Sequence, residues 1–275
     1  MQRLYCSLIL LLMSGSLCGQ EASDKVTVPF SDPSRPGQVK ANLIHGGITV
    51  TAYDGKEVIV EARARAGRSR RSEKSEERTE GMKRLQIATT GLTVVEENNV
   101  IDVSASSHSR PVDLLIQVPT RTSLKLGCVN SGDIKVERVQ GDIEANNVNG
   151  SVTLTGISGS AVAHALNGGV VVLFNQVMQG KTMSFSSMNG KVDVTFPENI
   201  KAKVVVKTDN GEIFSDFDIQ LDPATRQPVV EDSRGQGGKY RVRVDKAVYG
   251  TINGGGPEIH FTNFNGSIYI RKAGK

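Results

Sequence analysis

The sequence predicts an all-β protein, most of it a parallel β-helix-like solenoid with coils of roughly 18 to 22 residues. Valine, isoleucine and threonine recur in short alternating runs, which suit strands, and the 29 glycines suit tight turns between them. A fixed glycine period between alternating runs indicates a repeat architecture. The period is nine residues, at Gly132, Gly141, Gly150, Gly159 and Gly168.

The first element is an export signal over residues 1–18, in which Arg3 precedes an apolar run from Leu8 to Met13. Cleavage after Cys18 predicts an exported protein in the periplasm, on the outer surface or outside the cell. A lipid anchor at Cys18 is the disfavoured alternative, because Leu17 stands where lipoprotein signals normally have Gly, Ala or Ser. No second hydrophobic run follows, so we expect no transmembrane helix in the mature chain.

Residues 19–123 are expected to form a β-strand region that caps the solenoid, with parallel or antiparallel pairing left open. A charged loop at 65–84 interrupts it, and the arginines Arg68, Arg70 and Arg71 precede several glutamates there. These arginines are candidate contacts for an anionic ligand, but the interleaved acidic residues favour a solvated surface loop. The alternating runs lie at 39–50, 57–64, 85–88, 92–95, 100–104 and 112–118.

Residues 124–275 are predicted to be the solenoid. Two alternating apolar residues follow each corner, as Ile134 and Val136 follow Gly132, and neighbouring coils must stack to bury them. Glycine, or asparagine followed by glycine, is expected to supply the positive φ of a corner. Asparagines at the same corner of successive coils would also hydrogen-bond along the stack. Asparagine precedes glycine at Asn149, Asn167, Asn189, Asn210, Asn253 and Asn265.

An antiparallel meander is the competing interpretation, because Asn-Gly is also the preferred two-residue hairpin turn. The solenoid requires residues 133–136, 151–154 and 169–172 to lie in register beside one another. Residues 218–238 break the period and are expected to form an inserted surface loop or hairpin. Cys128 is in phase with neighbouring leucines and is expected to be a buried thiol.

The sequence contains no recognisable catalytic centre, and no cofactor or metal is expected. It lacks a Gly-x-Ser-x-Gly nucleophile elbow and a Walker-type phosphate loop. The formal net charge of +4 is too mild to indicate nucleic acid, and tryptophan is absent. The histidines are far apart in the sequence, at His45, His108, His164 and His260.

One acidic series keeps an enzymatic alternative open. A carbohydrate-active β-helix enzyme needs clustered carboxylates on one strand face. A solvated flank that keeps the protein soluble is the favoured interpretation of this series. Its members are Asp193, Asp209, Glu212, Asp216 and Asp218.

The repeated Asn-Gly-x-Ile/Val-x-Val segments resemble the bacterial "putative adhesin" β-strand-repeat family, a domain of unknown function. The closing stretches Thr251–Ile259 and Phe264–Ile268 also resemble it, and the resemblance covers about residues 40–275. It implies a β-helix-like fold in the cell envelope and carries over no catalytic residue.

The favoured function is therefore a non-enzymatic exported envelope protein, an adhesin or scaffold that presents a solenoid face to an envelope glycan, lipid or protein. No nucleic acid is expected among its partners. The first alternative is a carbohydrate-active β-helix enzyme that uses the acidic series. The second is an envelope stress-sensing regulator whose Arg68, Arg70 and Arg71 contact an anionic ligand.

Overall fold

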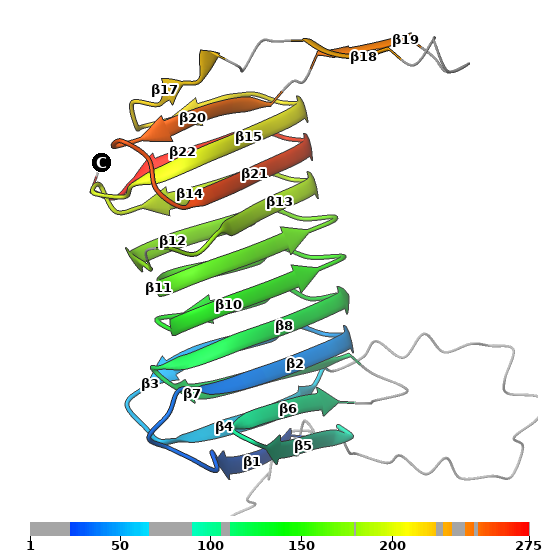
Figure 1. The fold of residues 1–275 in the computed structure, drawn as a ribbon. Helices are drawn as coiled ribbons and strands as arrows, with labels where there is room; N and C mark the ends of the chain where they lie inside the picture. The colour runs from blue at the N-terminus through cyan, green and yellow to red at the C-terminus, as the bar shows by residue number, and fades with distance from the viewer. Residues whose placement is uncertain are drawn as a thin grey trace, which may run out of the picture.

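The computed structural model describes residues 23–65, 90–105, 111–178, 180–223, 228–232, 240–244 and 247–274. The predicted leader with Cys18 and the arginines Arg68, Arg70 and Arg71 lie outside these residues. Apart from one residue of 3₁₀ helix, Pro223, the regular elements of the described residues are strands, which confirms the all-β prediction. Twenty strands join one folded sheet (Figure 1).

The sheet consists of two stacks of strands that enclose one core. The strands of each stack follow in their spatial order. The first stack contains β5 (Leu92–Glu97), β6 (Val100–Ala105), β2 (Gly37–His45), β8 (Thr122–Asn130), β10 (Gln140–Asn147), the second half of β11 (Val152–Ala165), β13 (Met183–Asn189), β21 (Glu258–Asn265), β15 (Ala202–Asn210), β20 (Val248–Ile252) and β17 (Gln220–Leu221).

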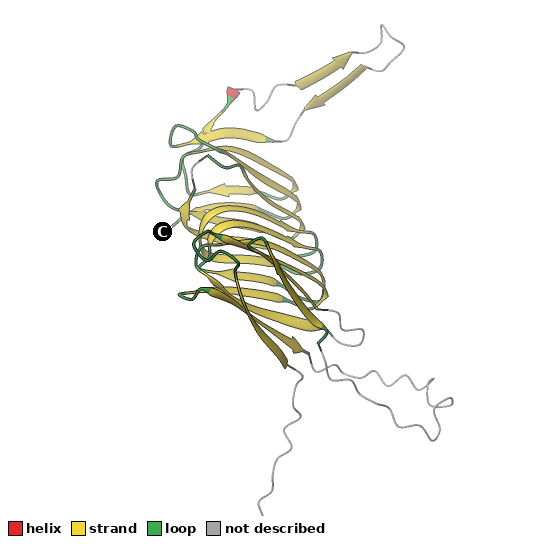
Figure 2. Ribbon diagram, turned by 60° about the horizontal axis from the view of Figure 1, so that its bottom comes forward, coloured by secondary structure: helices red, strands yellow, loops and turns green. Residues whose placement is uncertain are grey.

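The second stack packs against the first, and most of its strands directly follow the corner glycines. It contains β1 (Ser23–Pro29), β4 (Glu57–Ala64), β7 (Val112–Pro119), β3 (Ile48–Tyr53), β9 (Ile134–Glu137), the first half of β11, β12 (Val170–Val177), β14 (Val192–Phe196), β22 (Ile268–Lys272) and β16 (Ile213–Ser215). Figure 2 shows the strands lying one above another along the molecule.

Pairing is parallel through the middle of both stacks. It is antiparallel at both ends of the first stack and at the N-terminal end of the second, whereas β16 ends the second stack in parallel pairing. In the N-terminal region β2 pairs in parallel with β6, and β3 pairs in parallel with β7. The pairs β1–β4, β4–β7 and β5–β6 are antiparallel. In the periodic region Val152 lies opposite both Ile134 and Val170 on parallel neighbours. Residues 133–136, 151–154 and 169–172 therefore lie side by side in register, and the antiparallel meander is wrong for this region.

The core lies between the stacks and is made by the alternating residues predicted to point inward. Ile134, Val136, Val152 and Leu154 are all fully buried. Toward the C-terminal half the core becomes aromatic. The rings of Phe174 and Phe196 stack at 5.2 Å, and Phe185 and Phe261 pack beside them at 5.6 Å from each other.

The order of strands in space differs from their order in the chain at both ends. The early strands β2 and β3 lie between β6–β7 and β8–β9. The last strands, β21 and β22, lie between β13–β14 and β15–β16, and Figure 1 shows red β21 between green β13 and yellow β15. A separate antiparallel pair, β18 (Pro228–Asp232) and β19 (Tyr240–Val244), forms its own two-stranded sheet.

Most of the corner glycines are required for a different reason from the predicted positive φ. Positive φ occurs at Gly46 and Gly266, but Gly150, Gly168 and Gly190 do not have it. Instead, a Cβ on Gly150 would lie 2.1 Å from the carbonyl oxygen of Gly132, and one on Gly168 would lie 2.2 Å from that of Gly150. Successive corners therefore stack more closely than any side chain permits, and this contact requires glycine.

Candidate binding surface

A ladder of asparagine side chains runs along one corner of the molecule, as the sequence predicts. Each amide nitrogen donates to the side-chain oxygen of the next asparagine at 2.8–2.9 Å. The ladder includes Asn130, which precedes serine and is absent from the Asn-Gly series. It excludes Asn253, whose amide donates to the carbonyl oxygens of Glu198 and Ile200. From one end to the other its members are Asn210, Asn265, Asn189, Asn167, Asn149 and Asn130.

An exposed apolar side chain directly precedes most of the ladder asparagines. One further member, Ile44, precedes His45, which lies opposite Asn130 in the parallel pairing of β2 with β8. We name this row the apolar ridge, and its members are Ile44, Val129, Val148, Leu166, Met188 and Phe264, exposed by 37–67%. Asp209, which precedes Asn210, ends the row.

The exposed large hydrophobic side chains of the protein are concentrated in the ridge. The twelve exposed large hydrophobic side chains of the described residues include all six ridge members, so half of them lie in a single row. Neighbouring strands are about 4.8 Å apart, so six successive strands carry the ridge over roughly 24 Å. Contiguous exposed apolar surface of this kind marks interaction sites more often than isolated exposed residues do.

A groove of about 360 Å³ separates the ridge from a parallel row of polar side chains on the same stack. Val148, Leu166, Met188 and Phe264 line one side of it. On the other side Nδ1 of His164 lies 2.5 Å from Oγ of Ser186. Burial lowers the pKa of His164, so its ring is neutral near pH 7 and leaves this side of the groove without a charge at that position.

The floor of this groove is formed by inward side chains that bind the corner backbone. Asn147 Nδ2 donates to the carbonyl oxygen of Gly132 at 2.9 Å, and Asn263 Nδ2 donates to that of Gly190 at 2.7 Å. The side-chain oxygens of both asparagines are buried and have no hydrogen-bond partner. Cys128 is buried as predicted, and this burial raises the pKa of its thiol.

The acidic series is divided between the two stacks. Asp216 accepts from the backbone nitrogen of Lys272 on β22, the strand that also carries Arg271. Asp193 lies on β14 in the second stack, where its carboxylate accepts from Arg271 Nε at 2.7 Å and Lys191 Nζ at 3.0 Å. Asp209 lies on β15 in the first stack. Within the described residues, no three His, Cys, Asp or Glu side chains are grouped so that they would hold a metal ion. No helix in that part of the chain has the length and apolarity to cross a membrane.

No protein-family model matches the chain, and a comparison with curated proteins finds no similar one. Three solved structures are similar over 92% of this chain. They are a "putative cell adhesion protein" from Clostridium sporogenes (10% identity, 100% of that chain, TM-score 0.42), a "putative adhesin" from Bacteroides fragilis (11%, 98%, 0.32) and a "putative lipid binding protein" from Parabacteroides distasonis (10%, 95%, 0.27). These identities and TM-scores are too low to bear on function.

Proposed function

We propose that this protein is a non-enzymatic, exported binding protein of the cell envelope that docks a protein partner along the apolar ridge. The observation that carries the proposal is the placement of six exposed apolar side chains at the ends of six successive strands of one stack. Because these strands are held by continuous backbone pairing, the row is pre-organised and loses little conformational freedom on binding.

The surroundings of the ridge favour a protein partner over a lipid surface. Protein interfaces have an apolar centre and a polar rim, and here the ridge is bordered by the asparagine ladder and the polar wall of the groove. Binding to anionic lipid depends on clustered Lys and Arg. Only Lys207 supplies a positive charge to the groove lining, and Asp209 lies beside it.

The proposed fold class supports this function. We propose that the two parallel stacks form a flattened β-solenoid over 124–275, capped by residues 19–123 and preceded by the export signal at 1–18. The registered parallel pairs and the stacked corners support the solenoid, and the antiparallel strands at each end support the caps. Antiparallel caps would protect the open edges that a stack otherwise exposes.

The test uses a double variant, Leu166→Asp with Met188→Asp, which places two charges in the middle of the ridge. The control is Val95→Asp with Leu173→Asp, two exposed apolar side chains elsewhere on the described surface. Labelled mature protein is sedimented with envelopes of the encoding bacterium, with protease-treated envelopes and with protein-free vesicles of the extracted lipids.

We expect binding to untreated envelopes only, and a loss of at least about tenfold in the ridge variant, because each buried apolar anchor contributes on the order of 1–2 kcal/mol. The control should bind like the wild type, and circular dichroism should show all three proteins folded. Equal binding to protein-free vesicles, or an unaffected ridge variant, would contradict the proposal.

A further inference from the structure

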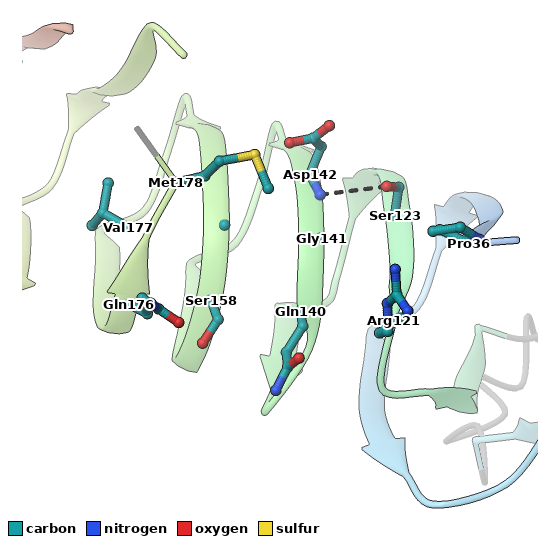
Figure 3. A pocket seen from close by; sticks show the side chains of 11 residues that line it. Pro36, Arg121, Ser123, Gln140, Gly141, Asp142, Ser158, Gln176, Val177 and Met178 are labelled. Atoms are coloured by element: carbon teal, nitrogen blue, oxygen red, sulfur yellow. Dashed lines mark hydrogen bonds between the residues drawn. The ribbon is translucent and has the colours of Figure 1, made fainter. Parts of the chain in front are cut away.

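A second groove crosses the same strands at their opposite, N-terminal ends, and its volume is about 590 Å³ (Figure 3). It lies where β8, β10 and the second half of β11 begin, whereas the apolar ridge lies where these strands end. The two surfaces share no lining residue. This groove is therefore a surface separate from the ridge.

One wall of the groove is a row of polar side chains, one from each successive coil. Gln140 lies opposite Ser158, Ser158 lies opposite Gln176, and Arg121 precedes them beside the start of β10. Figure 3 shows these four side chains along one side of the groove. Neighbouring members are separated by about 4.8 Å, the spacing between strands, so the row spans roughly 14 Å.

The side chains of this row are available to a ligand. Within the described residues, Arg121, Gln140, Ser158 and Gln176 form no side-chain hydrogen bond or ion pair. Arginine offers five donors, an amide offers both donors and an acceptor, and a hydroxyl offers one donor and two acceptor positions. The row therefore presents both donors and acceptors at regular intervals.

The floor of the groove is bare backbone because stacking requires glycine there. A Cβ on Gly159 would lie 2.2 Å from the carbonyl oxygen of Gly141, and a Cβ on Gly141 would lie 2.5 Å from that of Thr122. The backbone of both glycines is already paired within β10 and β11. An extended peptide would have no free backbone groups to pair with on this floor, so strand addition is excluded as a binding mode.

The charge facing the groove is positive. Asp142 also lines it, but its carboxylate accepts from Ser160 Oγ at 2.6 Å and from Lys181 Nζ at 2.5 Å, so its charge is already paired. Arg121 is the remaining charged side chain of the lining. One unpaired cation and no aromatic ring do not suit a nucleic acid, which needs several cations or stacking platforms.

We propose that this groove binds an acidic oligosaccharide. Arg121 pairs with a carboxylate of the sugar chain, while Gln140, Ser158 and Gln176 hydrogen-bond hydroxyl groups on successive rings. The glycine floor allows the rings to approach the backbone closely, and the side chain of Met178, opposite the polar row in Figure 3, contacts their C–H faces. The site is separate from the ridge and does not depend on the ridge being a docking surface.

The test measures calorimetric affinity of the mature protein for a hexameric oligogalacturonate, with neutral maltohexaose as the reference sugar. Three variants are compared with the wild type: Arg121→Ala, the double variant Gln140→Ala with Gln176→Ala, and Lys135→Ala. Lys135 is an exposed cation on β9 of the second stack and serves as the control for general charge. A panel of other carboxylated oligosaccharides extends the search if the first probe has the wrong linkage.

We expect the carboxylated sugar to bind at least tenfold more tightly than the neutral one, with an affinity that falls as salt is added. Arg121→Ala should remove this preference, the double glutamine variant should weaken both sugars at least fivefold, and Lys135→Ala should change neither. Equal affinity for neutral and acidic sugars, an equal loss in Lys135→Ala, or no binding across the carboxylated panel would overturn the proposal. The ridge variant Leu166→Asp with Met188→Asp should bind the sugar normally, so failure of either proposal is distinguishable from failure of the other.

Discussion

Some interior side chains of this protein are polar because they hydrogen-bond backbone carbonyls that the strand pairing leaves free at the corners. Asn147 and Asn263 occupy positions where apolar residues would be expected, and each donates to a corner glycine carbonyl. Ser187 does the same for Gly168 at 2.7 Å. An unpaired buried carbonyl is costly, so these polar side chains stabilise the corners even though the two asparagine oxygens remain without partners.

Two adjacent glycines make the stacking requirement testable. In Gly168→Ala the new Cβ would lie 2.2 Å from a backbone oxygen, whereas in Gly169→Ala the nearest atom, the Lys191 carbonyl oxygen, is 3.2 Å away. We expect Gly168→Ala to lower the free energy of unfolding by about 3 kcal/mol or more and Gly169→Ala by about 1 kcal/mol or less. Urea denaturation measures both, and equal effects would show that close approach is not what selects glycine.

Asp193 makes stability depend on pH. Burial alone would raise the pKa of this carboxyl, but hydrogen bonds from Arg271 and Lys191 outweigh it and hold the pKa below its ordinary value. A lowered native pKa stabilises the fold above the unfolded pKa of about 3.9, and this stabilisation is lost as pH falls through the native value.

Asp193→Asn should therefore lower the free energy of unfolding by about 2 kcal/mol at pH 7, and the difference from wild type should shrink at a second, acidic pH well below the unfolded pKa of about 3.9. Urea titrations at the two pH values test this. The control is Asp102→Asn, which removes an exposed carboxylate of β6 and should be nearly neutral at both. A pH-independent difference would assign the effect to packing instead.

At the scale of elements, the parallel pairing converts a sequence repeat into continuous rows. The same strand position on β8, β10, β11, β13 and β21 produces the asparagine ladder, and the preceding position produces the apolar ridge. Within the ladder every amide donates in the same direction, from Asn210 toward Asn130. Interior members therefore both donate and accept, whereas Asn210 only donates to its ladder neighbour.

This difference predicts that alanine substitutions at interior and terminal ladder asparagines lower the free energy of unfolding by different amounts. Asn167→Ala breaks two ladder hydrogen bonds, with Asn149 and Asn189, whereas Asn210→Ala breaks one, with Asn265. At a net value of about 0.5–1 kcal/mol for each exposed bond, the first variant should lose about twice as much unfolding free energy as the second. Thermal and urea unfolding measure this ratio. Equal losses would mean that the number of ladder hydrogen bonds broken does not determine the loss of stability.

At the scale of the whole molecule, the C-terminal strands complete the stack from within. Because β21 and β22 each pair with strands on both sides, they connect β13–β14 to β15–β16. They also carry Phe261 and Ile268, which are fully buried in the core. The end of the chain is therefore an interior part of the fold and not an addition to its edge.

Truncation after Ile252 should consequently abolish cooperative unfolding and expose apolar surface, because four strands lose a parallel partner at once. The contrasting variant replaces residues 224–246 with a short Gly-Ser linker. Among the described residues β18 pairs only with β19. Asp222 N already donates to the Tyr249 carbonyl oxygen at 2.9 Å, so the ends to be joined are close together.

We expect the linker variant to unfold within about 3 °C of the wild type. Calorimetry compares the two deletions. A truncated chain that melts cooperatively at the wild-type temperature would show that β21 and β22 are dispensable.

The local features of this protein were predictable because they depend on residues close together in the chain. The two-residue alternation after each corner predicted the buried positions of Ile134, Val136, Val152 and Leu154. The Asn-Gly series predicted the ladder, although Asn130 was missed because serine follows it. The apolar residue before all ladder asparagines except Asn210 was a further signal present in the sequence, visible once the asparagines are aligned by corner.

The sequence by itself determined the strands, the corners and the inward side chains, because side-chain alternation and glycine spacing act over a few residues. Only the tertiary structure decided which coils are neighbours, since every coil has nearly the same period and pairs equally well by pattern. Asn265 therefore lies beside Asn189, 76 residues earlier in the chain, which also places Phe264 next to Met188. The continuity of the ridge and the alignment of the polar groove depend on that long-range register.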